Sequence, residues 1–67
     1  DAHCEDDIGG LALVDEDYAW CTGQIKALAE RHAQGRIVSL LEGGYNLDAL
    51  ARCVAAHVRA LAACVPG

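Results

Sequence analysis

The sequence predicts part of an α/β domain, in the order loop, helix, strand, helix. Two stretches with helical spacing of apolar residues flank one short apolar run at 37–41. That run is apolar at nearly every position and is bounded by charged residues and glycines, a pattern typical of a strand buried on both faces of a parallel sheet. Because such a strand cannot leave both of its edges unpaired, we expect its partner strands outside these residues. The prediction is therefore one partial domain over residues 1–67, taken from a mainly parallel sheet.

The first half of the chain predicts a loop followed by a helix. Residues 1–14 combine an acidic cluster with two adjacent glycines, which favours a loop. Asp15 is the expected N-cap, with two further acidic residues in the first turn, where negative charge is favourable. Apolar residues then recur at three- and four-residue spacing from Tyr18 to His32, and Gly35 is the expected C-cap.

The second half predicts a strand, a turn and a second helix. The Glu-Gly-Gly-Tyr turn at 42–45 follows the strand at 37–41, and Asn46 is the expected N-cap. Pro66 and the glycine after it should end this helix. One stripe of the helix is apolar and comprises Leu47, Leu50, Ala51, Val54, Val58, Leu61 and Ala62.

Composition and charge exclude several classes of protein. Of 67 residues, 54% are hydrophobic, so intrinsic disorder is not the main interpretation, although only 4% are aromatic. The net charge of −5 argues against a nucleic-acid partner or an anionic membrane surface, because both need clustered Lys and Arg. No apolar stretch is long enough to span a membrane, and no signal peptide is recognisable. Without an initiator Met, the chain is expected to be cut from a longer protein.

The four cysteines, Cys4, Cys21, Cys53 and Cys64, lie far apart and form no CxxC motif. An even number in a short chain is compatible with two disulfides in a secreted scaffold. Free thiols in a cytosolic protein fit better, because most of these cysteines fall within helical patterns. Zinc coordination by Cys4 with His3 would lack a second pair of ligands. We therefore expect a cytoplasmic protein, and the roles of the four cysteines stay open.

Residues that could carry chemistry follow the ends of two predicted strands, where functional groups of a parallel sheet gather. Asp1 would end a preceding strand, and the turn with Gly43, Gly44 and Tyr45 follows the strand at 37–41. Neighbouring strands would bring Asp1 and Tyr45 to one edge of the sheet. There a carboxylate can bind a metal and a phenol can donate to a developing oxyanion. The structural alternatives are a loop-capping carboxylate and an aromatic ring packed over the helix start.

The three histidines give weaker evidence of a functional role. Asp1 and His3 could form a two-ligand Asp-x-His metal motif, but a lone histidine is more often a hydrogen-bonded loop residue. His32 and His57 fall within the predicted helices, and we expect both to be structural.

Four stretches together carry a resemblance to a known family. They are Asp-Ala-His at 1–3, Asp-Asp-Ile-Gly-Gly-Leu-Ala-Leu at 6–13, Asp-Tyr-Ala-Trp at 17–20 and Ser-Leu-Leu-Glu-Gly-Gly-Tyr-Asn-Leu at 39–47. This set closely resembles the C-terminal part of the zinc-dependent histone deacetylase family, above all its class II-like branch and the bacterial acetylpolyamine and acetoin-utilisation relatives. The resemblance covers nearly all of this chain but a minor portion of such a catalytic domain. It implies an arginase/deacetylase-like α/β fold with a mainly parallel sheet.

The resemblance also implies roles for individual residues. Asp1 matches the last of the family's three zinc ligands, whereas His3 matches a position that does not bind metal. Tyr45 matches the tyrosine that stabilises the oxyanion of the acetamide. Gly43 and Gly44 match the glycines that line the acyl channel. The other two zinc ligands and the paired histidines of the family would lie upstream of residue 1.

The implied activity is hydrolysis of the acetyl amide of acetyl-lysine or acetylpolyamine by a water that Zn²⁺ activates. The implied partner is the remainder of the parent catalytic domain, and the 67 residues alone are expected to be inactive. Cys4, Cys21 and Cys53 depart from the residue types expected of the family, but none stands at a position used for chemistry.

Two other functions remain open at this point. A phosphate-binding module could use the strand–Gly-Gly–helix turn at 41–47, since helix N-termini attract phosphate. GxGxxG and a P-loop lysine are absent, however, and Glu42 would repel an anion. The other alternative is a non-catalytic interaction module that folds against a partner.

Overall fold

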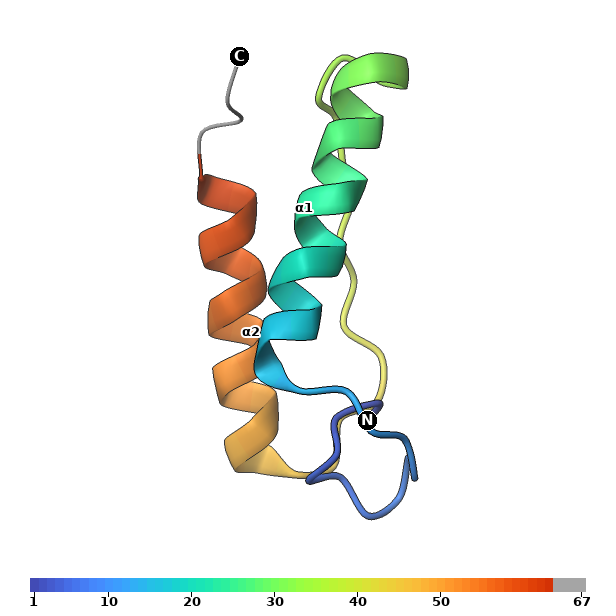
Figure 1. The fold of residues 1–67 in the computed structure, drawn as a ribbon, viewed down its shortest axis with the longest axis vertical. Coiled ribbons are helices and arrows are strands. Elements are labelled where there is room, and N and C mark those ends of the chain that lie inside the picture. The colour runs from blue at the N-terminus through green and yellow to red at the C-terminus, as the bar shows by residue number, and fades with distance from the viewer. Residues whose placement is uncertain (64–67) are drawn as a thin grey trace.

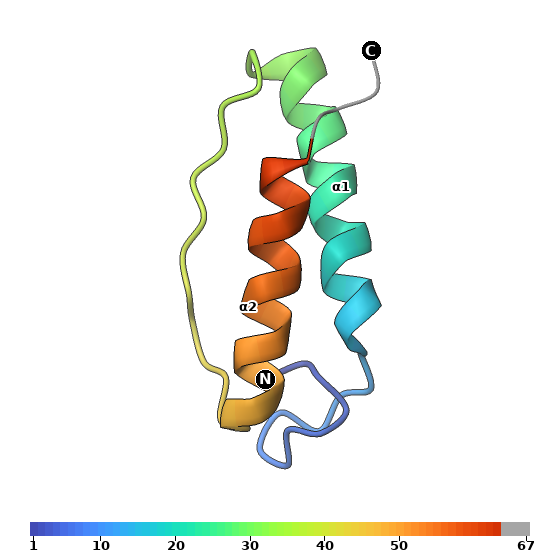
Figure 2. The same ribbon diagram turned by 90° about the vertical axis from the view of Figure 1, so that its left-hand side faces the viewer.

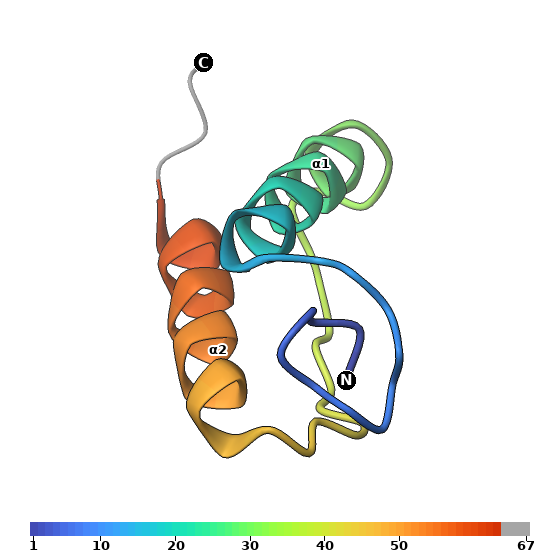
Figure 3. The same cartoon turned by 60° about the horizontal axis from the view of Figure 1, so that its bottom comes forward.

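The computed structural model describes residues 1–63, which form two helices, α1 (Asp15–His32) and α2 (Leu47–Ala62). The two helices lie side by side and run in the same direction, and the connection between them returns the chain from the end of α1 to the start of α2 (Figure 1). The loop that precedes α1 lies at the end of the molecule where both helices begin (Figure 3). Cys64 and the predicted stop at Pro66 fall outside the described residues.

The N-cap of helix α1 lies one residue earlier than the sequence predicted. Its N-cap is Val14, whose backbone N–H donates to Oδ2 of Asp17 over 2.8 Å. The prediction that Asp15 is the N-cap is therefore wrong. Asp15 is the first helical residue, and its carboxylate is occupied by His3 and Arg52 instead of the helix amides.

The end of α1 also differs slightly from the prediction. The helix ends at His32 with Ala33 as its C-cap, so Gly35 lies two residues beyond the cap and is not the cap itself. Gly35 has φ +76° and donates its N–H to the carbonyl of Ala29 over 2.9 Å. The glycine thus still helps to end the helix, because it satisfies a carbonyl of the last turn in a conformation that favours glycine.

Helix α2 begins as predicted. The side chain of Asn46 accepts a hydrogen bond from the N–H of Ala49 over 2.9 Å, which confirms Asn46 as the N-cap. Farther along, the ammonium group of Lys26 in α1 donates to the carbonyl of Ala60 in α2 over 2.9 Å and also to that of Ala63. The two helices are therefore joined by a charged contact near the end of α2.

The predicted strand at 37–41 does not form in the structure. Within residues 1–63, no backbone hydrogen bond joins this segment to another, and the structure assigns no strand to it. Val38 and Leu40 are 89% and 82% exposed. The physical reason is that a strand needs a neighbour to take its N–H and C=O groups, and the described residues supply none. The segment instead runs as an open connection beside the helices (Figure 2). The predicted sheet is thus not confirmed.

The apolar core of the described residues is thin. The buried apolar residues are Ala29, Ala49 and Cys53, and among residues 1–63 no large side chain is fully buried. Many large apolar side chains stay open to solvent, among them Trp20, which is 66% exposed. Neither helix has the length and apolarity that crossing a membrane would need, as far as the described residues go.

Candidate functional site

The structure places the Asp1 carboxylate against the Gly-Gly turn. A Cβ atom added to Gly43 would lie only 2.9 Å from Oδ1 of Asp1. A Cβ atom added to Gly44 would lie 2.8 Å from Cδ1 of Leu50. Both glycines also have positive φ angles, +69° and +94°. A side chain at either position would therefore meet backbone strain, and the side chain of Asp1 or Leu50 would have to shift to make room.

A hollow of about 550 Å³ opens beside this turn. Asp1, Gly43 and Gly44 line it, together with apolar side chains of α2 such as Leu50 and Val54. Tyr45 does not line the hollow, and its side chain is 55% exposed. The structure thus gathers three of the four predicted site residues around one opening, while the fourth follows directly in the chain.

Asp6 links the parts of this site, and its sequence position predicted no such role. Its side chain is only 4% exposed. Oδ2 accepts hydrogen bonds from the backbone N–H groups of Tyr45 and Asn46, over 2.6 and 2.9 Å. Oδ1 accepts from the N–H groups of Ile8 and Gly9, over 3.0 and 3.1 Å. One carboxylate therefore joins the N-terminal loop to the turn that carries Tyr45.

These hydrogen bonds lower the pKa of Asp6 below its ordinary value. Burial raises its pKa, but the backbone N–H donors from Tyr45, Asn46, Gly9 and Ile8 together outweigh burial and lower the pKa to about 2. The side chain is therefore a carboxylate at neutral pH. An Asp three residues before a Gly-Gly pair does signal a local turn, because Asp side chains bond backbone amides two or three residues ahead. The partners 39 and 40 residues away left no signal in the sequence.

The Asp6 contacts bear on the phosphate-binding alternative. A phosphate at the start of α2 would need the free backbone N–H groups that a helix N-terminus offers. The N–H groups of Tyr45 and Asn46 already donate to Asp6, and that of Ala49 donates to the Asn46 side chain. An internal carboxylate thus occupies the place that an anion would take, which disfavours phosphate binding there.

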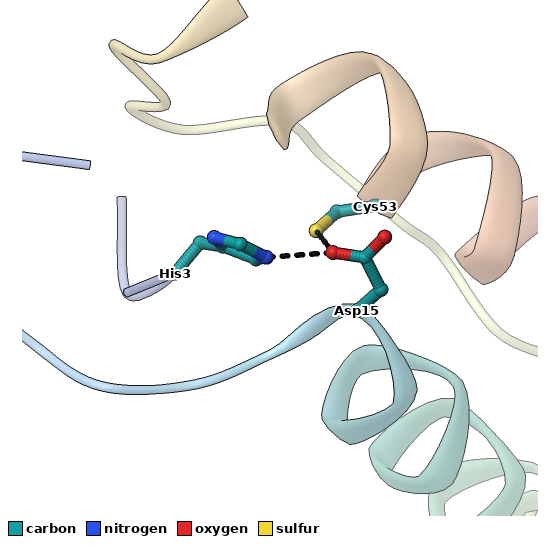
Figure 4. A group of neighbouring side chains, drawn as sticks. All are labelled: His3, Asp15 and Cys53. Carbon is teal, nitrogen blue, oxygen red and sulfur yellow. Dashed lines mark hydrogen bonds and ion pairs between the residues drawn. The ribbon is translucent and has the colours of Figure 1, made fainter. Parts of the chain in front are cut away.

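A second cluster joins the N-terminal loop to both helices. His3, Asp15 and Cys53 point toward one another, with Nε2 of His3 2.6 Å and Sγ of Cys53 3.9 Å from Oδ1 of Asp15 (Figure 4). Arg52 donates to the other oxygen of Asp15 over 3.0 Å and also pairs with Glu5. Imidazole, carboxylate and thiolate are all zinc ligands, and the three atoms lie within 4.8 Å of one another.

The hydrogen bonds of His3 oppose metal binding by this cluster. The backbone N–H of Glu5 donates to Nδ1 of His3 over 3.1 Å, so Nδ1 carries the lone pair and Nε2 carries the proton. That proton is donated to Asp15, and Nε2 has no free lone pair for a metal. Burial, followed by the negative charge of Asp15, raises the pKa of the Cys53 thiol. The cluster is therefore a hydrogen-bonded clasp of His3, Asp15 and Cys53, and His3 is a loop histidine rather than a ligand.

The groups around Asp15 stabilise the ionised form of its side chain in the clasp. The hydrogen bond from His3, and then the bond and charge of Arg52, lower the pKa of Asp15 in spite of burial. The hydrogen bond to Asp15 in turn raises the pKa of Arg52. The clasp thus keeps its carboxylate ionised at neutral pH and ties the loop to α1 and α2.

His57 connects the return segment to α1. Its Nε2 lies 2.7 Å from Oγ of Ser39, and its Nδ1 lies 2.7 Å from Oγ1 of Thr22. The Thr22 hydroxyl donates its proton to the carbonyl of Tyr18 over 2.7 Å, so it accepts from Nδ1 of His57. His57 therefore holds the segment at 37–41 beside the helices.

The cysteines within the described part of the chain are free. Cys4 and Cys21 are exposed, and Cys53 is buried in the clasp. Two disulfides would need all four cysteines paired, so the two-disulfide arrangement is not formed in this structure.

Comparisons with known proteins relate the chain to deacetylases. Residues 1–61 match the family model described as the histone deacetylase domain. The chain is 48% identical over 61 residues to type-2 histone deacetylase 1 of Dictyostelium discoideum, covering 91% of this chain and 4% of that protein. It is 44% identical over 48 residues to a probable deacetylase of Archaeoglobus fulgidus, covering 72% and 13% respectively. It is 43% identical over 61 residues to the chloroplastic histone deacetylase 14 of Arabidopsis thaliana, covering 91% and 14%. The chain thus spans a small share of each of these relatives.

Proposed function

Because the chain belongs to the histone deacetylase family, we propose that the protein of which it forms part hydrolyses the acetyl amide of acetyl-lysine or of an acetylpolyamine. The observation that carries the proposal is the Asp1 carboxylate packed against the Gly43–Gly44 turn at the mouth of a hollow, with Tyr45 next in the chain. The reaction is a metal-assisted amide hydrolysis.

Asp1 is the residue of this chain that fits a zinc ion. Within the described residues its carboxylate accepts no hydrogen bond, and carboxylate oxygen is an accepted zinc ligand. A catalytic zinc site takes three protein ligands, so the other two would come from residues outside this chain. Bound there, the ion supplies polarisation of the acetyl carbonyl and a lowered pKa for a water molecule.

Tyr45 and the two glycines complete the part of the site that this chain contributes. The phenol of Tyr45 donates a hydrogen bond to the oxyanion that develops on the acetyl carbonyl, an interaction worth about 2.7–4 kcal/mol when such a donor is removed. Gly43 and Gly44 line the channel for the acyl group, because backbone without side chains leaves room beside Asp1. The exposed phenol is free to turn toward a bound substrate.

The rest of the domain would complete both the sheet and the site. We propose that residues 37–41 become a strand when neighbouring strands of the parent domain supply partners. Two features support this. The segment connects two helices that run in the same direction, which is the path of an α/β unit, and Val38, Leu40 and Leu41 are exposed. With one zinc ligand of three, the 67 residues alone are inactive.

The test uses the parent protein with an acetyl-lysine peptide and an acetylated polyamine as substrates. We expect Tyr45→Phe to keep bound zinc and to lower kcat by about 10²–10³-fold. Asp1→Ala should lower the zinc content, whereas the control Asp7→Ala, a change at an exposed carboxylate of the same loop, should leave both unchanged. Full activity of zinc-loaded Tyr45→Phe would contradict the role of Tyr45.

A further inference from the structure

We propose that Asp6 is a positioning residue for this hydrolysis, because it fixes the backbone of Tyr45 relative to the loop that carries Asp1. The inference rests on the proposed function, in which Asp1 and Tyr45 act on the same acetyl group. Its structural basis is that the two carboxylate oxygens of Asp6 accept hydrogen bonds from different segments of the chain. Oδ1 binds amides of its own loop, and Oδ2 binds the amides of Tyr45 and Asn46.

The turn before Tyr45 needs an anchor of this kind. Gly43 and Gly44 both lie at positive φ, and glycine has more backbone freedom than any other residue. The turn therefore supplies little stiffness of its own, and the direction of the Tyr45 side chain depends on what holds its backbone. The closest polar contact of that backbone is Oδ2 of Asp6, at 2.6 Å from the nitrogen of Tyr45.

The anchor is itself rigidly held. The Asp6 side chain is 4% exposed, and its backbone N–H donates to the carbonyl of His3 over 3.0 Å. Next to it, the Asn46 side chain donates to the carbonyl of Glu5 over 3.0 Å while its oxygen caps α2. The loop and the start of α2 are thus joined by three hydrogen bonds, two to the Asp6 side chain and one to the carbonyl of Glu5. A shift of Asp6 would therefore move the backbone of Tyr45 relative to the loop that carries Asp1.

A carboxylate is required at this position because all four of its partners are donors. Asp6→Asn keeps the size of the side chain but replaces one acceptor oxygen with an NH₂ group, which would face N–H donors. The turn then loses an oxygen that holds either the loop or Tyr45. Misplacement of a catalytic group by about 1 Å can cost about 10²-fold in rate.

The experiment compares Asp6→Asn with Asp7→Asn in the parent protein. The two changes remove the same charge from adjacent residues, but Asp7 is exposed. We expect Asp6→Asn to lower kcat by about 10- to 100-fold, with KM within about threefold of the wild type and zinc content unchanged. Asp7→Asn should leave all three quantities at their wild-type values.

A Tyr45→Phe background separates positioning from a general structural role. If Asp6 acts through the Tyr45 hydroxyl, Asp6→Asn should lower kcat by no more than about threefold once that hydroxyl is gone. An equal loss in both backgrounds, or a wild-type kcat for Asp6→Asn, would overturn the inference. If Tyr45→Phe alone retains full activity, the failure lies in the proposed function instead.

Asp6→Glu keeps the inference testable if Asp6→Asn does not fold. This variant retains the charge and both acceptor oxygens but moves them by one methylene. We expect it to bind zinc normally and to lower kcat in the wild-type background more than in the Tyr45→Phe background. An unchanged kcat for the folded, zinc-loaded Asp6→Glu would count against positioning by Asp6.

Discussion

The Asp6 carboxylate and the backbone N–H of Tyr45 form a 2.6 Å hydrogen bond across 39 residues of chain. This bond connects a loop that precedes both helices to the turn that begins the second one. Together with the hydrogen bond from the Asn46 side chain to the carbonyl of Glu5, it sets the relative placement of the two proposed catalytic segments.

The first prediction concerns pH. The pKa of Asp6 is about 2 in the folded protein against an ordinary value of 3.8, so the unfolded chain binds more protons between these values. Stability from Asp6 should be fully present above about pH 5 and should be lost as the pH falls toward about 2. We expect the unfolding midpoint of the parent protein to exceed that of Asp6→Asn at pH 7 and the difference to shrink on acidification. A difference that is constant from pH 7 to about pH 2 would contradict this assignment.

The second prediction separates strain from contact at the Gly-Gly turn. Gly43→Ala and Gly10→Ala both place a side chain at nearly the same positive φ, +69° and +67°, which costs about 1–2 kcal/mol in either case. Only at Gly43 would the new methyl group meet the Asp1 carboxylate, since nothing lies within 4 Å of it at Gly10. We therefore expect both variants to lose stability but only Gly43→Ala to weaken zinc binding, measured by competition with a chelator. Equal zinc affinities of the two variants would contradict either the role of Asp1 as a zinc ligand or its contact with the turn.

The third prediction concerns the clasp of His3, Asp15 and Cys53. Because Nε2 of His3 carries a proton and the Cys53 thiol stays protonated, this cluster should not take up metal. We expect Cys53→Ser to leave the zinc content of the parent protein unchanged. Cobalt substitution should likewise give no thiolate-to-cobalt absorption band that depends on Cys53. Such a band would mean that the clasp opens to bind the ion.

The fourth prediction concerns the N-cap of α2. Asn46→Ala removes the acceptor for the N–H of Ala49 and should cost about 0.5–2 kcal/mol in the free energy of unfolding. The control is Gln24→Ala, a change at an exposed position within α1. Urea unfolding of both variants measures the difference. A loss for Gln24→Ala as large as that for Asn46→Ala would show that the cap contributes nothing specific.

The sequence predicted the elements whose signals are local. An asparagine before an apolar stripe identified the start of α2 correctly, because the cap bond spans only three residues. Asp15 was misassigned as a cap because its partners, His3 and Arg52, are brought in by tertiary structure. The strand at 37–41 depends on neighbours that the described residues do not contain, so its apolar pattern alone could not form it.

In the candidate site, too, some residues could be predicted from the sequence and one could not. Asp1 and the glycine turn were predicted from their places after expected strand ends and from the resemblance. The structure places Asp1 against Gly43, and the roles of these residues stay predictions. Asp6 was missed because only two of its four backbone donors are local, and nothing in the spacing of the sequence records its meeting with Tyr45 and Asn46.

The shared direction of α1 and α2 has an electrostatic consequence. Each helix carries a macrodipole equivalent to about half a positive charge at its N-terminus, and two such dipoles side by side in the same direction repel each other. Both N-termini lie at one end of the molecule, and the loop beside them belongs to the first seventeen residues, which hold seven of the ten carboxylates (Figures 1 and 3). This acidic segment therefore acts as the counter-charge of the helix pair. Ionic screening weakens this attraction at the surface, and it weakens the repulsion between the two parallel dipoles as well.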